Sequence, residues 1–449
     1  MRILLKEINT NLDAFDTYSI FKDEKDIIFL DSSLENDLGR YSFIGVNPFM
    51  VLKGRHSLCL MNGKENDCDV FEKLSELLKK YRVENSTEIP FIGGCIGYFS
   101  YDIGLDMEDI KVSSIEDLII PHFYFVFYDN LIIFDNQIQK SYISACGILM
   151  DPKESIDCIE KVMLQHEKVE YEEVKKSEAE FHSNFTKEEY VKTLSKMKEY
   201  IRNGDIYIAN MTQRLFSKAK KDSYKIYRDL RKINPAPFAA FMRFEDFDII
   251  SSSPERFLKI RNKVVETSPI KGTRPRGSNV PEDEKNKNEL LNSGKDRAEL
   301  LMIVDLERND LSKVCKPHSV KVTELFKLEE YSTVFHLVST VVGELKEGID
   351  AVHCLKACFP GGSITGTPKI RAMEIIDELE GLKRSIYTGS IGYFSFDGNA
   401  DFNIVIRTII KKDDTVYFGV GGGITCDSDE EAEYQESLDK AKALLRVIK

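Results

Sequence analysis

A glutamate and a lysine that could act together lie within residues 251–277, which read SSSPERFLKIRNKVVETSPIKGTRPRG. Glu255 follows a serine run and a proline, as is typical where a strand ends at a polar turn. Lys271 lies between an isoleucine and a glycine, in what we interpret as a short turn. Partial desolvation there would lower the pKa of the ammonium group and make the amine a usable nucleophile. From the spacing alone, a surface hairpin with two solvated charges is the simpler interpretation of this stretch.

The neighbouring residues predict strands that would position this pair. Residues 247–250 are apolar, and residues 257–260 and 264–265 look like strands on either side of a short turn. A hairpin-like path would bring Glu255 and Lys271 together, which would give the site one acid and one nucleophile.

Two acidic pairs on predicted helices are candidate metal ligands. Asp296 and Glu299 lie three residues apart on a helix predicted over 295–306, and Glu433 and Glu436 repeat the spacing on the terminal helix. This spacing places both members of a pair on one helix face. The helix dipole alone explains acids at a helix start, but it does not explain two matching pairs. Two such pairs would form an all-oxygen site suited to Mg²⁺.

Further residues are candidate ligands for an anion. The glycine-rich stretch 360–369 precedes a predicted helix, where backbone amides can hold an anion. Arg407 lies in an apolar strand predicted over 402–410, so it needs an anionic partner, from either a substrate or an internal salt bridge. The three glycines 421–423 follow another predicted strand and would let a ligand approach the backbone closely. A single histidine, His336, lies in an apolar run and is interpretable as a core residue.

The string SPERF…PIKGTRPRG resembles the core of the chorismate-utilising enzymes, and matching pieces run from about Leu30 to the C-terminus. The resemblance implies an α+β fold in which two interleaved parts surround antiparallel β-sheets flanked by helices. Lys271 resembles the lysine of the aminodeoxychorismate synthase component I (para-aminobenzoate synthase large subunit) branch. The anthranilate synthase large subunit has alanine there. The implied activity is amination of chorismate to 4-amino-4-deoxychorismate, which leads to p-aminobenzoate and folate.

The resemblance also assigns roles to individual residues. It implies that Lys271 attacks C2 of chorismate, that Glu255 is the general acid for the departing C4 hydroxyl, and that His336 lies near the ring. Glu299 and Glu436 would ligate Mg²⁺, with Asp296 and Glu433 in a second, water-bridged shell. The substrate would be bound by Thr365, Gly366, Tyr387, Arg407, Gly421, Gly422, Gly423 and Lys440.

One position departs from the family pattern. Ile208 stands where the family usually has glutamine and where the isochorismate and salicylate synthase branch has a lysine that activates water. An isoleucine side chain cannot exchange a proton. We therefore expect no water-adding reaction by that route, and packing is the simplest role for Ile208.

Family members can hold tryptophan in a pocket between the two parts. The matching positions here are Ser32, Leu38, Gly39, Arg40, Tyr41, Pro237, Phe238 and Ala239. Two alternatives to the aminating activity remain. One is an anthranilate synthase large subunit, and the other is a catalytically silent protein that binds tryptophan or another ligand. The intact catalytic and metal set disfavours the silent alternative.

Composition limits the classes of function. The chain has 449 residues and a net charge of −13, which argues against a nucleic-acid binder or an anionic-membrane binder. None of its nine cysteines falls in a CxxC pair, so we expect reduced thiols and no zinc site of that type. No apolar run is long enough for a signal peptide or a membrane span, which predicts a cytoplasmic protein.

The order of segments predicts two domains and a linker. We expect an N-terminal scaffold or regulatory domain over 1–163, a charged linker over 164–183 and a catalytic chorismate-binding domain over 184–449. Thr186 and Glu189 form a capping box at the start of a helix that ends near Asn203. Residues 279–294 are polar and are predicted to be a loop, and residues 308–310 are predicted to form a turn.

No glutaminase is evident in the chain. Residues 93–97 match the G-x-C-x-G pattern of a nucleophile elbow, but nothing helical is predicted directly after Cys95, and glycines in a strand more often mark close backbone approach. We therefore expect a separate glutaminase (amidotransferase) subunit to deliver ammonia.

Overall fold

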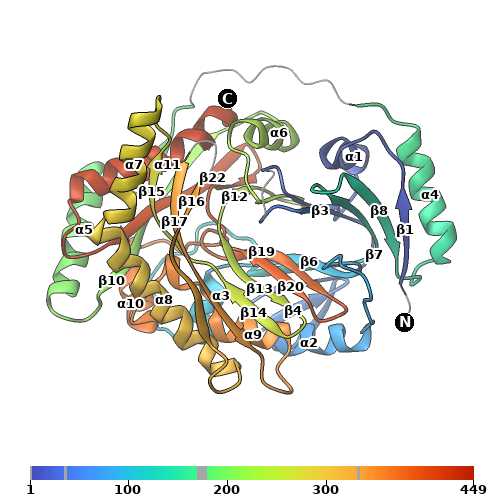
Figure 1. Cartoon of the computed structure of the whole chain (residues 1–449), viewed down its shortest axis with the longest axis horizontal. Helices are drawn as coiled ribbons and strands as arrows, with labels where there is room; N and C mark the ends of the chain where they lie inside the picture. Colours follow the sequence, from blue (N-terminus) through green and yellow to red (C-terminus); the bar gives the residue numbers. More distant parts are fainter. Residues whose placement is uncertain (1–2, 35–37, 169–178, 331–333) are drawn as a thin grey trace.

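The computed structural model describes residues 3–34, 38–168, 179–330 and 334–449. Within these residues the chain is an α+β protein in which all named strand pairings are antiparallel. Figure 1 shows a curved body of strands with helices on its outer sides. The predicted fold class is therefore confirmed.

The strands account for most of the core. They are β1 (Leu4–Ile8), β2 (Ile28–Asp31), β3 (Tyr41–Arg55), β4 (Leu58–Met61), β5 (Lys64–Asp67), β6 (Gly94–Phe99), β7 (Phe123–Asp135), β8 (Lys140–Ala145), β9 (His182–Ser183), β10 (Ile208–Lys218), β11 (Phe238–Arg243), β12 (Asp248–Ser253), β13 (Arg256–Arg261), β14 (Val264–Thr267), β15 (Ile270–Pro275), β16 (Lys321–Glu330), β17 (Val334–Glu344), β18 (Gly366–Thr367), β19 (Ser390–Ser395), β20 (Ala400–Asn403), β21 (Thr408–Lys412) and β22 (Thr415–Ile424).

N-terminal strands lie in the middle of one continuous ladder of strands. Starting from β10, which also pairs with β9 and β18, the ladder runs through β22, β21, β12 and β11, and then β2, β3, β7 and β6. It continues through β19, β20, β13, β14, β17 and β16. The central strand β7 is buried along its whole length, because its apolar and aromatic run is covered on both faces. Segments from the two ends of the sequence are thus interleaved.

Helices cover the outside of the ladder. They are α1 (Ala14–Phe21), α2 (Val70–Lys80), α3 (Asp102–Met107), α4 (Pro152–Leu164), α5 (Lys187–Arg202), α6 (Ser223–Ile233), α7 (Val280–Asn292), α8 (Gly294–Val314), α9 (Ala351–Cys358), α10 (Lys369–Glu380) and α11 (Glu430–Ile448). The predicted capping box opens α5, where the Thr186 side chain accepts from the backbone of Glu189 and the Glu189 side chain accepts from the backbone of Thr186. Figure 1 shows α7 and α8 beside β15, β16 and β17, with α1 and α4 at the opposite end of the molecule.

The predicted loop over 279–294 is wrong. Most of it forms α7, whose N-cap Asn279 accepts a hydrogen bond from the backbone of Glu282. A proline occupies the first turn, where its missing N–H costs nothing. Leu290 is the buried contact of this helix among the described side chains, so its apolar period was too weak to detect.

Two further boundaries differ from those predicted. Residues 308–310 lie inside α8 rather than in a turn, because Asp310 is buried and faces Lys369. The strand predicted over 402–410 is interrupted between β20 and β21. Arg407 lies in that interruption with a φ of 50°, a left-handed conformation that ends the run.

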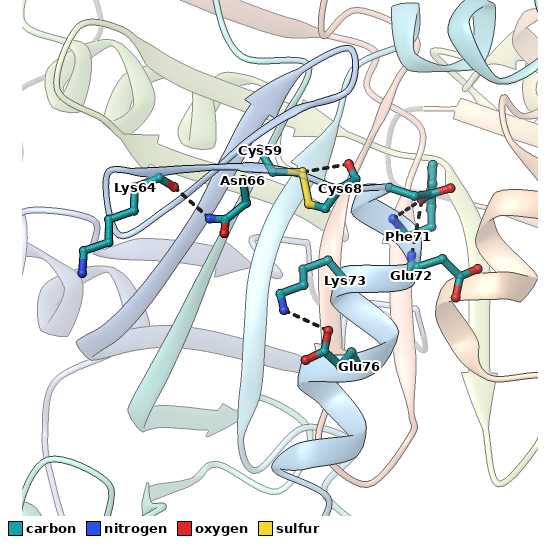
Figure 2. Close-up of a disulfide and its surroundings, with 9 residues drawn as sticks. Cys59, Lys64, Asn66, Cys68, Phe71, Glu72, Lys73 and Glu76 are labelled. Carbon is teal, nitrogen blue, oxygen red and sulfur yellow. Dashed lines mark hydrogen bonds and ion pairs between the residues drawn. A yellow bond between two sulfur atoms is a disulfide. The ribbon is translucent and has the colours of Figure 1, made fainter.

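The cysteine expectation is also corrected. Cys59 and Cys68 form a disulfide, with Cα atoms 6.1 Å apart, that joins β4 to the residue directly before Asp69, the N-cap of α2 (Figure 2). Their spacing of nine residues matches no motif that would have indicated a pair. Cys95 of the G-x-C-x-G match is buried in β6, and burial raises the pKa of its thiol.

The predicted linker between the two domains falls partly outside the described residues. Residues 169–178 of the predicted linker lie outside the described part of the chain, and the boundary near Asn184 stays a prediction. In the described residues, no helix combines the length and the apolar character needed to cross a membrane.

Candidate active site

Lys271 lies in a strand rather than in the turn that the sequence predicted. It belongs to β15, whose register against β17 shifts between Lys271 and Thr273. Gly272 occupies this bulge with a φ of 77°, and a Cβ there would lie 2.8 Å from the Leu290 side chain. The bulge turns the lysine toward the loop that precedes α10, where its Nζ donates to the Ser363 carbonyl at 3.1 Å.

Glu255 is the candidate general acid that interacts electrostatically with Lys271. Only 7% of Glu255 is exposed, and burial raises the pKa of its carboxyl, while Ser363 and Lys271 oppose that shift. Burial likewise lowers the pKa of Lys271, against the pull of Glu255 and Glu299. Each shift favours the uncharged form, so the pair is tuned toward a neutral amine and a protonated acid. Both side chains interact with Ser363 and with each other's charge, which agrees with the prediction that they lie together.

The loop 360–365 is fixed by buried charged groups. The backbone N–H of Gly362 donates to Glu307 at 3.0 Å, and Lys369 donates to the carbonyls of Cys358 at 2.7 Å and Pro360 at 2.6 Å. Arg384 donates to the Ile364 carbonyl at 2.8 Å. These hydrogen bonds hold the loop in place beside Lys271, with its remaining backbone groups available as hydrogen-bond donors and acceptors.

Ser363 is a site residue that the sequence reasoning missed. Its carbonyl accepts from Lys271, and its hydroxyl interacts with Glu255. It therefore bridges the candidate acid and the candidate nucleophile. The glycine-rich pattern indicated this loop only as a source of backbone amides, and no signal pointed to a carbonyl or a hydroxyl role.

His336 and Arg407 are two further buried site residues that interact electrostatically, and Arg407 also interacts with Glu255. His336 Nδ1 is 2.8 Å from the Thr273 hydroxyl, and burial together with Arg407 lowers the pKa of the imidazole to about 4. His336 is therefore neutral at pH 7. Arg407 is held at 3.4 Å from Asn234 Oδ1, and burial lowers the pKa of its guanidinium, while Glu255 opposes this shift. A buried arginine whose neighbouring acid has a raised pKa is well placed to bind an anion.

The four predicted metal ligands do not all face one point. Glu299 and Glu433 are each 8% exposed, and the Lys295 ammonium lies between them, 3.9 Å and 3.5 Å from their carboxylate oxygens. Glu299 Oε1 is buried without a hydrogen-bond partner among the described residues. Asp296, in contrast, pairs with Arg274 at 3.1 Å. Among the described residues, no three of these acids bring their carboxylate oxygens within 4.8 Å of one another, and Asp296 is held by an arginine.

Glu436 is the most exposed of these acids and faces the triple glycine. Burial would raise the pKa of its carboxyl, but Lys440, 2.9 Å away, lowers it. Lys440 also donates to the Gly421 carbonyl at 2.8 Å. A Cβ on Gly422 would lie 3.2 Å from Glu433, and one on Gly423 would lie 3.5 Å from the Lys271 amine. The glycines of β22 thus connect the acids to the candidate nucleophile.

Three other predicted residues have structural contacts. Thr365 is 1% exposed, and its hydroxyl donates to the Gly361 carbonyl at 2.8 Å. Gly366 packs so closely on β10 that a Cβ would lie 2.2 Å from the Ile208 carbonyl. The Tyr387 ring covers Gly419 of β22. These three residues lie around the site, and the Thr365 hydroxyl stabilises the loop 360–365 from within.

Ile208 forms an apolar wall beside the lysine. Its side chain is 2% exposed, and it lies 3.4 Å from the Cβ position of Gly423, next to the Lys271 amine. The packing role expected for Ile208 agrees with this burial, and the neighbouring hydrocarbon contributes to the desolvation of the amine.

A separate cavity of about 290 Å³ lies between β2, β11 and β13. Every predicted effector-pocket residue except Gly39 lines this cavity: Ser32, Leu38, Arg40, Tyr41, Pro237, Phe238 and Ala239. Ser32 links the two sides, since its hydroxyl donates to the carbonyls of Tyr41 at 2.7 Å and Pro237 at 3.1 Å. The predicted residues therefore share one cavity, and tryptophan as its occupant stays a prediction.

Comparison with known proteins identifies the family. A family model described as chorismate binding enzyme matches residues 31–446. The chain belongs to the chorismate binding enzymes. It is 39% identical to aminodeoxychorismate synthase component 1 of Bacillus subtilis (strain 168), covering 91% of this chain and 89% of the relative. It is also 39% identical to anthranilate synthase component 1 of Acetivibrio thermocellus, covering 96% and 92%.

A solved structure agrees with this assignment. Anthranilate synthase component I from Streptococcus pneumoniae TIGR4 superposes with a TM-score of 0.82 at 32% identity, covering 92% of this chain and 93% of that chain. Relatives with two different activities are thus similar to this chain to about the same degree. The family is established, and the choice of product depends on individual residues.

Proposed function

We propose that the chain is the chorismate-aminating component of an aminodeoxychorismate synthase. The observation that supports this best is Lys271, a desolvated amine 3.1 Å from the Ser363 carbonyl and paired electrostatically with the buried Glu255. The anthranilate branch of the family has no amine at this position. A nucleophile and an acid together permit a displacement in two steps.

The proposed reaction begins when the neutral Lys271 amine attacks C2 of chorismate. The ring double bonds shift, the C4–O bond breaks, and Glu255 gives its proton to the departing hydroxyl, which leaves as water. Ammonia then attacks C4, the double bonds return, and the C2–N bond to Lys271 breaks. The proton lost by ammonia restores Glu255 or the amine, so the enzyme ends in its starting state.

Acidic and basic groups around this pair would hold the two carboxylates of chorismate. Glu299 and Glu436, with Glu433 nearby, would supply the hard oxygens that Mg²⁺ prefers, and Glu299 Oε1, which has no hydrogen-bond partner among the described residues, fits such a ligand. Bound Mg²⁺ would neutralise the ring carboxylate. Arg407 and the backbone of Gly421, Gly422 and Gly423 would hold the other carboxylate.

A second protein would supply the ammonia. The relatives are named component 1, which implies another component in those systems. Cys95, the one match to a glutaminase pattern, is 0% exposed and cannot reach a substrate. We therefore propose a separate glutaminase partner, with free ammonia as a substitute in its absence.

The identity of the product tests this proposal. Purified protein is incubated with chorismate, Mg²⁺ and ammonium at mildly alkaline pH, and the products are separated by mass. We expect a chorismate-sized amino product without pyruvate, and we expect Lys271→Ala to lose it. Lys263→Ala, in the turn between β13 and β14, is the matched control and should keep full activity.

Two outcomes would contradict the proposal. Anthranilate with pyruvate would assign the chain to the anthranilate branch. This branch is the alternative because the chain is also 39% identical to an anthranilate synthase component 1. No turnover, even after a glutaminase subunit is added, would favour a silent ligand-binding protein.

A further inference from the structure

Two histidines and two carboxylates converge outside the candidate active site. His56 lies between β3 and β4, Asp106 on α3, Glu116 in the segment after α3, and His122 directly before β7. One nitrogen or oxygen atom from each of His56, Glu116 and His122 lies within 4.8 Å of the other two. The two imidazole rings are 4.6 Å apart and tilted by 73°. The described residues thus bring three metal-type donors to one point.

Asp106 gives these donors a defined orientation. Its carboxylate lies 3.0 Å from His56 Nδ1 and 3.5 Å from His122 Nδ1. The hydrogen bond to His56 keeps the proton on Nδ1 and leaves the lone pair on Nε2, which is the usual second-shell arrangement of metal-binding histidines. At His122 the longer contact acts through charge. His122 Nε2 in turn lies 3.1 Å from Glu116 Oε1, so an imidazole nitrogen and a carboxylate oxygen meet.

Burial makes His122 the fixed donor. It is 2% exposed, and its Nδ1 has no hydrogen-bond partner among the described residues, because the contact with Asp106 is longer than a hydrogen bond. A buried polar nitrogen without a partner is costly. A cation on Nε2 would make the Nδ1 proton a stronger donor and draw Asp106 toward it. His56, with 51% of its side chain exposed, leaves the point accessible from solvent.

Neighbouring cations select the type of ion. Arg55 and Lys383 both contact Glu116, the latter at 3.6 Å, and they offset the charge of the two carboxylates. The cluster therefore lacks the excess negative charge and the oxygen-only donors that Mg²⁺ or Ca²⁺ needs. Two imidazoles and one carboxylate suit a divalent ion such as Zn²⁺.

We propose that His56, Glu116 and His122 bind a zinc-type divalent ion, with Asp106 orienting the imidazoles. The ion joins the β3–β4 turn to the residues that enter β7. It also fixes α3, whose Gly104 packs against Pro360 of the loop beside Lys271. The site is distinct from the carboxylates Glu299, Glu433 and Glu436, and it does not depend on the proposed reaction.

Metal titration of the whole chain tests this proposal. Untagged protein is stripped with a chelator, kept in excess Mg²⁺ to occupy the carboxylates, and titrated with Zn²⁺ by calorimetry. We expect one equivalent to bind. We expect His56→Ala to weaken binding at least about tenfold, as expected on loss of a ligand-sphere residue. Co²⁺ in place of Zn²⁺ should give visible bands that the variant lacks.

A matched control is available on α9. His353 also contacts two carboxylates, Asp350 at 2.7 Å and Glu72 at 3.1 Å, but no second histidine completes a described cluster there. His353→Ala should bind Zn²⁺ as the parent does. Thermal unfolding in chelator should be nearly the same for the parent and His56→Ala, since the exposed contact of His56 with Asp106 contributes little. No binding in excess Mg²⁺, equal binding by His56→Ala, or a thiolate absorption band with Co²⁺ would each overturn the proposal.

Discussion

Glu255 and Lys271 must both be uncharged in the proposed first step. Burial raises the pKa of Glu255 and lowers that of Lys271, so the two values move toward each other. The active form carries one proton on the pair. We therefore expect kcat/KM for chorismate, at constant free ammonia, to fall at low pH when both groups are protonated and at high pH when both have lost their protons.

The variant Glu255→Gln separates the two limbs of this profile. Glutamine does not titrate, so only Lys271 remains, and the rate should rise with pH to a plateau without an alkaline fall. The rate at the plateau should be about 10²- to 10⁴-fold lower, because the general acid is lost. Glu245→Gln, after β11 and with 70% of its side chain exposed, should keep the parent profile. An alkaline limb that persists in Glu255→Gln would contradict the pairing.

Glu307, behind the loop 360–365, gives a prediction about stability. Burial, with Asp310 adding to it and Lys369 opposing it, raises the pKa of Glu307 from 4.5 to about 7. Because the folded pKa is the higher one, the folded state favours the protonated acid. This contribution is present below pH 4.5 and is lost as the pH rises toward 7. Above that range the ionised acid costs about 3 kcal/mol.

Glu307→Gln should therefore raise the free energy of unfolding by about 3 kcal/mol at alkaline pH and change it little in acid. The Gly362 N–H keeps an acceptor in this variant. Asp305→Asn on the same helix, with 79% of its side chain exposed, serves as the control and should have no pH-dependent effect. Denaturant titrations at the two pH values measure both. An equal effect of Glu307→Gln at both would show that the folded-state pKa is not raised.

Charged residues of the site could be predicted from sequence, whereas their uncharged partners could not. Lys271 and Glu255 have side chains with evident chemistry, and a resemblance placed them. Ser363 acts through a carbonyl and a hydroxyl, groups that many loop residues carry. Asp296 shows what spacing leaves out, since the spacing did not indicate its pair with Arg274, and its second-shell role stays a prediction. The spacing of residues along a helix indicates which face a side chain occupies, but it does not indicate which residue that side chain contacts.

At the scale of the element, α7 shows how a helix escapes detection. It has one buried apolar side chain, Leu290, so the period that predicts helices is missing. Its signals lie at its start, in the cap Asn279 and the proline that follows. Cap signals in a polar segment are weak alone, because the same residues favour turns. Helix α5 was predicted correctly for the converse reason, because its start is capped and one of its faces is apolar and buried.

The cap of α7 is therefore expected to matter. Asn279→Ala removes the side-chain acceptor for the Glu282 N–H, 3.0 Å away, and should cost the helix about 1 kcal/mol. Faster amide hydrogen exchange over the first turn of α7 is the measurement. Asn288→Ala, at an exposed position in the same helix, should not increase exchange, because alanine favours helices. Equal acceleration in both variants would argue against the capping role.

At the scale of the whole molecule, the order of the strands was beyond the reach of sequence patterns. The apolar runs that became β2, β3, β7 and β6 predict strands, but the pairings β2–β11 and β6–β19 join segments that are far apart in the chain. Such pairings depend on complementary packing of the complete chain, which local periodicity does not encode. Only the family resemblance indicated an interleaved arrangement.

This interleaving predicts that N- and C-terminal segments lose structure together. Asp31 of β2 is 2% exposed and accepts from Arg231 of α6 at 2.6 Å and from the Tyr227 hydroxyl at 2.9 Å. Asp31→Asn leaves the arginine without its counter-ion in a mostly buried place. We expect a loss of about 3 kcal/mol in the free energy of unfolding, near the lower end for a broken buried pair because Arg231 is partly exposed.

Two spectroscopic probes measure whether the segments unfold together. The chain has 19 tyrosines and no tryptophan, so tyrosine fluorescence and far-UV circular dichroism are compared in denaturant. Both transitions should move by the same amount in Asp31→Asn. Asp157→Asn removes a surface pair with Lys6, 53% exposed on the aspartate side, and should move neither, since exposed pairs contribute little. If the two probes separated in Asp31→Asn, the ladder would consist of independently stable parts, and continuity through β2 and β11 would not couple them.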